Sequence, residues 1–250
     1  MGKKSMYESQ SSGCPDYSGS GRDAFVVGYV SGLAKASADV PRIAELSVGS
    51  GALSKALVQA LPKAEFTFAD ISSANLKVLE SAFSGFKAQG VRGPRLIECD
   101  FDTQFSLLED AAFDVVIALD ILEHVFDVFA FIGNCRRILK PGATLILRTP
   151  NIGYIRHRLG LLAGGLPVTS SWFGKRGELG EWRKFWSWDG GHLHLFTIPV
   201  LRQLISEEGF SIELCRDPGT KWESVRGIWP NLMYSNPLIV ARNNKGNSKG

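Results

Sequence analysis

Short apolar segments alternate with longer amphipathic segments from residue 42 to residue 149. The short segments are rich in β-branched and aromatic residues, as buried strands are, and the longer ones repeat apolar residues at helical spacing. The predicted strands are residues 42–48, 65–69, 95–99, 113–119, 144–148, 210–214 and 237–241. The predicted helices are residues 52–61, 73–86, 128–139 and 198–208, with a turn at residues 140–142.

This alternation predicts an α/β fold with a doubly wound, mostly parallel sheet of seven strands. Crossover connections between parallel strands are right-handed and cover both faces, so we expect ligands at the carboxyl ends of the strands. The predicted domain is residues 22–242, flanked by Ser- and Gly-rich ends, 1–21 and 243–250, that we expect to be mobile. The rhythm breaks at 151–191, which predicts a structureless, aromatic-rich insertion that acts as a lid.

Composition narrows the class of protein further. The chain has 250 residues, of which 44% are hydrophobic and 21% charged, as in ordinary globular proteins. Four cysteines without paired spacing, no signal peptide and no apolar run long enough to span a bilayer predict a cytoplasmic protein without integral membrane association. A net charge of +3 is too small to favour nucleic acid as a partner. The oligomeric state is not predicted.

A tight turn follows the first strand. Gly49 and Gly51 let the backbone approach a ligand where a helix begins, and Asp70 ends the next strand at the distance expected for a carboxylate that binds ribose hydroxyls. Glu45 lies inside the strand, where a carboxylate needs a partner such as a ligand ammonium group or adjacent backbone. A pyrophosphate would repel Glu45, and Ser54 stands where a dinucleotide fingerprint has its third glycine, so a nicotinamide cofactor is the weaker alternative.

The run Glu-Leu-Ser-Val-Gly-Ser-Gly at 45–51 resembles motif I of the class I S-adenosylmethionine-dependent methyltransferases, and later segments match in order over about residues 40–242. The resemblance implies the Rossmann-like methyltransferase fold and S-adenosylmethionine as the cofactor. The first glycine of motif I is replaced by Ser47, so we expect a shifted backbone or a direct hydroxyl contact there. The cofactor-binding residues that the resemblance implies are Glu45, Ser47, Gly49, Gly51, Asp70, Ile71, Asp100, Phe101, Leu119 and Asp120.

Histidines supply the candidate catalytic groups. Such an enzyme must align an acceptor with the methyl group and remove a proton from a hydroxyl, and His is suited to proton transfer near neutral pH. His124 follows the fourth strand, and His192 and His194 follow the insertion, so the two segments are predicted to converge over the cofactor. Each histidine has an alternative structural role, in hydrogen bonding to backbone or in anchoring the lid.

Asp120, Glu123 and His124 would share one helix face if their segment is helical. The run resembles one in ubiquinone-pathway O-methyltransferases, and a divalent metal is an alternative to our prediction that no metal is bound.

The predicted function is methyl transfer to a hydroxyl, or an amine, of a small molecule. The motif typical of base-amino methylation is missing after the fourth strand, and no cysteine stands where cytosine-carbon methylation needs one. Cations and aromatic residues interleave in 151–191, and an apolar stretch at 159–168 could contact a membrane surface or a greasy substrate. Nucleic-acid methylation, nicotinamide-dependent oxidation and a non-catalytic cofactor-binding module are the alternatives.

Overall fold

The computed structural model describes residue 4 and residues 21–87, 93–164 and 192–244. Almost all of the two predicted mobile ends and most of the predicted insertion lie outside these residues. The strands are β1 Arg42–Leu46, β2 Glu65–Asp70, β3 Arg95–Glu98, β4 Phe113–Leu119, β5 Leu139–Arg148, β6 Phe210–Arg216 and β7 Leu238–Asn243. The helices are α2 Gly21–Ala36, α3 Ala52–Ala60, α4 Ser73–Lys87, α5 Val128–Ile138, α6 Ile155–Leu162, α7 Ile198–Glu207, α8 Glu223–Arg226 and α9 Pro230–Met233, with 3-10 turns η1 Phe105–Leu107 and η2 Leu122–His124.

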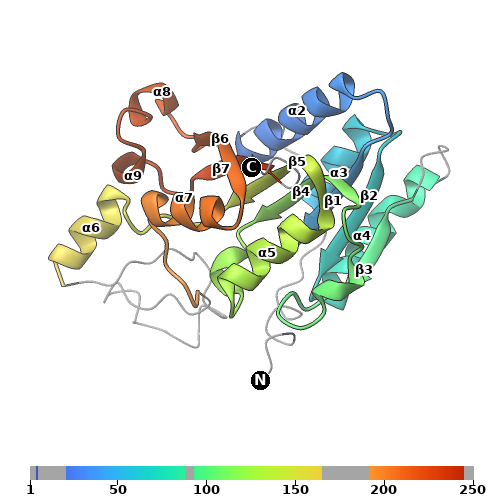
Figure 1. Cartoon of the computed structure of the whole chain (residues 1–250), viewed down its shortest axis with the longest axis horizontal. Helices are drawn as coiled ribbons and strands as arrows, with labels where there is room; N and C mark the ends of the chain where they lie inside the picture. Colours follow the sequence, from blue (N-terminus) through green and yellow to red (C-terminus); the bar gives the residue numbers. More distant parts are fainter. Residues whose placement is uncertain (1–3, 5–20, 88–92, 165–191, 245–250) are drawn as a thin grey trace, which may run out of the picture.

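The seven strands form one sheet in the order β3-β2-β1-β4-β5-β7-β6. The first five strands are parallel, whereas β7 inserts antiparallel between β5 and β6 (Figure 1). The direction of winding reverses between β1 and β4, and a crevice opens at such a point because the helices leave the sheet in opposite directions. The predicted α/β, doubly wound, mostly parallel fold is confirmed.

Helices cover both faces of the sheet. Buried apolar side chains of α2, α3 and α4 pack on one face, and those of α5 and α7 pack on the other. The sequence of the central strand β4 is continuously apolar because both of its faces are buried. Val116 and Ala118 belong to the core cluster on one face, and Val115 and Ile117 belong to the cluster on the other. In the described part of the chain, no helix is both long enough and apolar enough to cross a bilayer.

Two local predictions were wrong. Residues 140–142 were predicted as a turn, but they lie within β5, where Gly142 has a φ of 73° and the register against β4 shifts between Phe113 and Val115. The strand therefore bulges at the proline and glycine instead of ending there. The predicted structureless insertion contains helix α6, Ile155–Leu162.

Candidate functional site

A cavity of about 200 Å³ lies at the carboxyl ends of the parallel strands, in the crevice between β1 and β4. Its walls come from the loops that follow β1, β2, β3 and β4, so residues far apart in the sequence meet there. The lining residues are Ser47, Gly49, Asp70, Ile71, Asn75, Asp100, Phe101, Asp120, Ile121, His124 and Val125.

The loop after β1 has three left-handed residues at alternate positions. Ser47, Gly49 and Gly51 have φ values of 67°, 53° and 79°, and Gly51 leads directly into α3. Glycine adopts this conformation without strain, but Ser47 does so at a cost of about 1 to 2 kcal/mol. The backbone at Ser47 therefore keeps the conformation that glycine prefers, and the serine side chain lines the cavity.

Asp70 is tied to the glycine loop. One carboxylate oxygen accepts a hydrogen bond from the backbone N–H of Gly49 at 3.2 Å, and the other accepts one from the N–H of Ser72 at 2.8 Å. The side chain of Asn75 on α4 also donates to this carboxylate. Burial raises the pKa of Asp70 because it penalises the charged form, while these hydrogen bonds act in the opposite direction. The carboxylate is thereby held at the cavity wall.

Glu45 lies behind the cavity and does not line it. Its carboxyl group is fully buried within β1 and accepts a hydrogen bond of 2.7 Å from the hydroxyl of Ser54 on α3. Burial raises the pKa of Glu45 to about 8, against the smaller opposing effects of the Ser54 hydrogen bond and the positive charge of Arg22. The partner that a strand carboxylate requires is therefore, in this structure, the serine of the following helix.

Asp120 projects from the end of β4 between two arginines. Its Oδ2 atom accepts a hydrogen bond from Arg22 of α2 at 2.9 Å and pairs with Arg148 of β5, while the backbone at Asp120 has a φ of 55°. Its Oδ1 atom is buried and has no hydrogen-bond partner among the residues that the structure describes. A buried acceptor left unpaired costs about 1 to 3 kcal/mol. Asp120 lines the cavity and keeps an oxygen whose capacity to accept a hydrogen bond is not used by the described residues.

Glu123, His124 and His192 form a cluster beside the cavity. The ring centroids of the two histidines lie 4.7 Å apart, and Nε2 of His192 lies 3.9 Å from Oε1 of Glu123. The hydroxyl of Thr149 donates to the other Glu123 oxygen at 2.9 Å. Burial, together with the nearby negative charge of Asp120, raises the pKa of Glu123 to about 7. One ligand atom from each of Glu123, His124 and His192 lies within 4.8 Å of the others, so these three residues could hold a metal ion.

The predicted helix face of Asp120, Glu123 and His124 does not form. Residues 122–124 make a single 3-10 turn, which leaves Asp120 outside it and bound to the two arginines. His192 takes the third place in the cluster instead. The segments of His124 and His192, 68 residues apart in the chain, meet as predicted, with their rings 4.7 Å apart, but the contact of His192 with Glu123 was not predicted.

The structure brings most of the predicted cofactor residues into one cavity. Glu45, Gly51 and Leu119 do not line it, and neither do His192 and His194. The ring nitrogen Nε2 of His194 lies 3.2 Å from the carbonyl oxygen of Phe126, so this side chain contacts backbone. The predicted residues that do line the cavity are Ser47, Gly49, Asp70, Ile71, Asp100, Phe101, Asp120 and His124.

Four residues at or beside the cavity were not predicted from the sequence. Asn75 stands at the start of the helix after Asp70, where a side-chain donor in the first turn was the available signal. Ile121 and Val125 flank the predicted Glu-His pair and add apolar wall. Arg22 reaches Asp120 from a helix that the apolar pattern did not predict.

Comparisons with known proteins agree on one family. Residues 44–145 match the model of a methyltransferase domain. The highly reducing polyketide synthase resH of Aspergillus sclerotiorum is 31% identical over 134 residues, which cover 50% of this chain and 5% of that protein. The ubiquinone biosynthesis O-methyltransferase of Bradyrhizobium sp. (strain ORS 278) is 38% identical over 73 residues, 29% of this chain and 27% of that protein. The chain therefore spans less than a third of either relative.

A solved structure extends the likeness to most of the fold. The carbon methyltransferase CurJ superposes with a TM-score of 0.58 at 21% sequence identity, over 88% of this chain and 53% of that chain. At this level of identity the likeness concerns the fold alone. The family-model match covers the β1 to β5 region, which contains Asp70, Asp120 and most other residues that line the cavity.

Proposed function

The chain belongs to the class I S-adenosylmethionine-dependent methyltransferases, and from this premise we propose that it methylates a hydroxyl group of a small molecule with a histidine as the proton acceptor. The family cofactor supplies a methyl group made electrophilic by its sulfonium, so the protein's task is to position and deprotonate the acceptor. An amine is the second acceptor class in this proposal. A cytoplasmic location is also part of it.

The donor set of the cavity fits this cofactor. Asp70 presents a carboxylate fixed by two backbone N–H groups, which suits the two hydroxyls of a ribose. Asp120 lines the same cavity and supplies a carboxylate acceptor for the cofactor's N–H groups. Gly49 has no atom within 4 Å of where a Cβ would lie, so the backbone there leaves space for a ligand. The acidic lining also favours a positively charged ligand.

One observation carries the proposed reaction: His124 lines the same cavity as Asp70 and Asp120. An imidazole at this position can take a proton from an acceptor held against the cofactor site. Glu123 and His192 lie beside it, so a positive charge that develops on His124 would be stabilised by a nearby carboxyl group. In this proposal His124 is the base and His192 acts through its ring contact with His124. His194, two residues after His192, is assigned to the binding of the acceptor.

Methylation of an activated carbon is a second candidate. The matched relatives include polyketide synthases, and a solved structure of the same fold is described as a carbon methyltransferase. A base that removes a proton from a hydroxyl can also remove one from a carbon next to a carbonyl group. The two candidates therefore share the site and differ in the acceptor.

Labelled methyl transfer to matched acceptors tests the proposal. We would incubate the purified chain with methyl-labelled S-adenosylmethionine and three acceptor sets: phenols and alcohols, amines, and β-ketothioesters. We expect label on oxygen, with a smaller rate on nitrogen. Label on carbon alone would support the second candidate, and cofactor binding without transfer to any set would contradict the proposed activity.

A further inference from the structure

Three helices form an apolar and basic surface at one end of the molecule, beside the site. These are α6, α8 and α9, which lie together at the left of Figure 1. None of the three helices has a buried residue. We propose that this surface, defined as residues 154–162 and 221–233 and called the docking surface below, binds the headgroup region of an anionic lipid bilayer.

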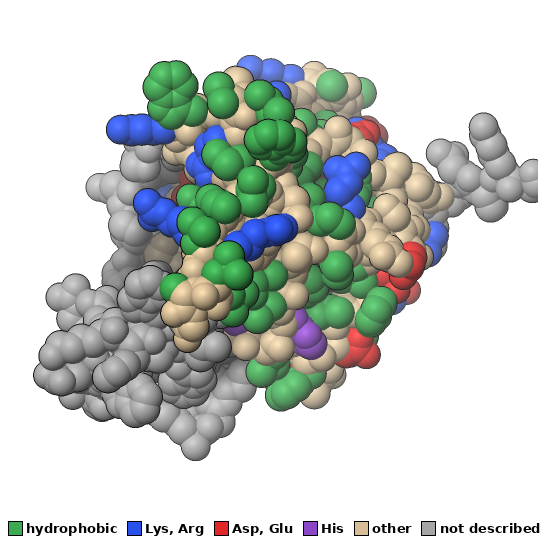
Figure 2. Space-filling model, turned by 90° about the vertical axis from the view of Figure 1, so that its left-hand side faces the viewer, with side chains coloured by type: hydrophobic (Ala, Val, Ile, Leu, Met, Phe, Trp, Pro, Cys, Tyr) green, Lys and Arg blue, Asp and Glu red, His purple; other side chains and the backbone are tan. Residues whose placement is uncertain are grey.

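The apolar side chains of the docking surface are unusually exposed. Trp222 and Trp229 are 79% and 68% exposed, and Leu162 at the end of α6 is 84% exposed. Leu159, Val225 and Ile228 are also exposed. Figure 2 views the molecule from this end and shows hydrophobic side chains gathered over it. A cluster of this kind on a water-facing surface marks an interaction site.

Cations are interleaved with these apolar residues. The docking surface carries three exposed cations, Arg156, Arg158 and Lys221, against one acidic residue, Glu223. The side chain of Arg226 is only 15% exposed and lies 3.6 Å from Asp217. In Figure 2 several Lys and Arg side chains lie among the hydrophobic ones, whereas the visible Asp and Glu side chains lie toward the right of the view. Tryptophan with Lys and Arg is the composition that settles at the interface between headgroups and acyl chains.

Hydrogen bonds hold the docking surface in place. The amide of Asn151, just after β5, donates to the carbonyl oxygens of Asn231 and Tyr234, which fixes α9 to the sheet. Arg226 donates to the carbonyl oxygen of Met233 and thus joins α8 to the end of α9. The Trp222 side chain projects from a residue with a φ of 62°, a strained conformation that the surrounding turn maintains. The surface is therefore preformed.

Charge distinguishes a bilayer from a second copy of the chain as the occupant. A twofold dimer would place the docking surface against itself and bring three exposed cations against three exposed cations around the apolar centre. An anionic bilayer instead supplies phosphate and carboxylate groups to the cations and a weakly polar layer to the tryptophans. The docking surface also adjoins the segment after β5, the strand that pairs with β4, and the loop after β4 lines the cavity.

Vesicle binding of the full chain tests the proposal. Cosedimentation would be measured with vesicles of phosphatidylcholine alone and of phosphatidylcholine mixed with phosphatidylserine. We expect binding to the anionic vesicles that weakens with salt. The variant Trp222→Ser/Trp229→Ser should bind at least about tenfold more weakly because its interfacial anchors are removed. The variant Arg156→Glu/Lys221→Glu should lose the preference for anionic vesicles.

A matched control removes exposed apolar residues elsewhere. Val40 and Leu107 are also exposed but lie outside the docking surface, so Val40→Ser/Leu107→Ser should bind vesicles as the unchanged protein does. Equal binding by all variants, or no binding to anionic vesicles by the unchanged protein, would overturn the proposal. So would a dimer in analytical ultracentrifugation that Trp222→Ser/Trp229→Ser converts to a monomer. Cofactor affinity, measured separately on each variant, reports on the proposed methyl transfer and is independent of these outcomes.

Discussion

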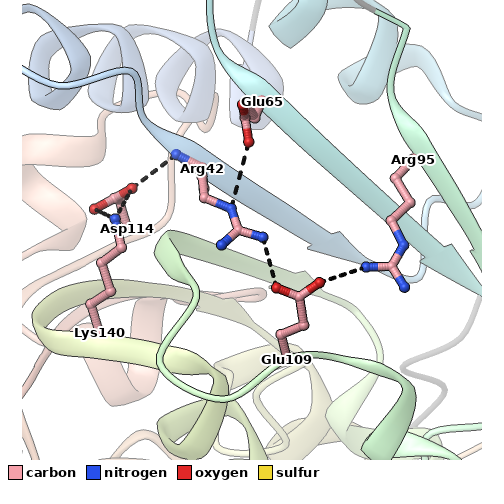
Figure 3. Close-up of polar contacts among 6 residues, drawn as sticks. All are labelled: Arg42, Glu65, Arg95, Glu109, Asp114 and Lys140. Carbon is pink, nitrogen blue, oxygen red and sulfur yellow. Dashed lines mark hydrogen bonds and ion pairs between the residues drawn. The ribbon is translucent and has the colours of Figure 1, made fainter.

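Charged side chains are balanced at the amino end of the parallel strands and unbalanced at the carboxyl end. At the amino end, three cations and three carboxylates form ion pairs that neutralise one another (Figure 3). These residues are Arg42, Glu65, Arg95, Glu109, Asp114 and Lys140. At the carboxyl end, four carboxyl groups meet two arginines, and within the described part of the chain one carboxylate oxygen has no hydrogen-bond partner. These residues are Glu45, Asp70, Asp120, Glu123, Arg22 and Arg148.

The charges at the amino end are already balanced within the protein, whereas those at the carboxyl end favour binding of a ligand. The ion pairs at the amino end are partly exposed, so each contributes little. Hydrogen bonding and the nearby charges of Arg42 and Arg95 lower the pKa of Glu109. At the carboxyl end, burial raises the pKa of Glu45, Asp70 and Glu123, which shows that their negative charges are incompletely compensated. A cationic ligand would supply the missing charge there.

The largest effect should come from the base proposed at the carboxyl end. His124→Ala should lower turnover by about 100- to 10,000-fold, because general-base catalysis contributes a factor of this size. Cofactor affinity should stay within about threefold of the original, since the proposed cofactor contacts are made by other residues. Steady-state kinetics and a separate cofactor titration would measure the two quantities.

A change at the amino end serves as the control for His124. Asp114→Asn removes the ion pair with Lys140 and should leave turnover unchanged. Equal losses of turnover in the two variants would mean that the assay reports stability rather than a proton-transfer role of His124.

The next effect concerns stability and pH. Because the pKa of Glu45 is raised to about 8, the folded protein keeps a proton that the unfolded chain releases above about 4.5. The contribution of this proton to the free energy of unfolding is therefore complete below about pH 4.5. It is lost as the pH rises toward 8, by about 1.4 kcal/mol for each pH unit. Glu45→Gln should flatten this slope and be more stable than the original by a few kcal/mol at pH 8. Urea unfolding at several pH values measures it.

Glu65→Gln is the matched control for Glu45. Glu65 lies on the neighbouring strand at the amino end, and its side chain is partly exposed. This variant should keep the original slope of stability against pH. A flat slope in the unchanged protein would contradict the assignment of a buried proton to Glu45.

A smaller effect should follow from the strained serine. Ser47→Gly relieves a left-handed residue and should stabilise the fold by about 1 kcal/mol, after the entropy cost of glycine is counted. It should also leave cofactor affinity equal or higher, because the cavity wall loses a side chain. Ala111 is left-handed too but lies at the amino end, with a φ of 47°. Ala111→Gly should give similar stabilisation with no change in cofactor affinity. If cofactor affinity changed in both variants, the change could not be attributed to the cavity wall at Ser47.

The smallest effect should come from breaking the amino-end ion pairs. Glu109 bridges Arg42 and Arg95 with contacts of 3.0 Å each, and its side chain is 55% exposed. Glu109→Ala should destabilise the fold by less than about 1 kcal/mol, and less in high salt. Thermal unfolding at two salt concentrations measures this. A loss of several kcal/mol would remove the contrast between the two ends.

Periodicity predicted the sheet because buried parallel strands and amphipathic helices leave clear patterns. It missed α2, where apolar residues such as Phe25, Val26 and Val27 follow one another without helical spacing. It also could not place β7 between β5 and β6, because strand order depends on pairing across the chain. The glycine loop and Asp70 were predictable because both are local signals at strand ends.

The side-chain arrangement of the site was less predictable. The contacts of His192 with Glu123 and of Arg22 with Asp120 join distant segments, and local spacing does not specify such partners. The 3-10 turn at residues 122–124 separates Asp120 from Glu123 and His124, although their spacing fits a helix. Spacing indicates which residues can share a helix only where a helix forms.

Calorimetric titration with S-adenosylhomocysteine tests the cavity assignment most directly. The unchanged protein should bind one equivalent, and Asp70→Asn should bind about 5- to 150-fold more weakly, which corresponds to the 1 to 3 kcal/mol of a lost hydrogen bond to a charged group. Glu109→Ala should bind as the unchanged protein does. No heat at millimolar ligand, or equal affinity in Asp70→Asn, would contradict the account.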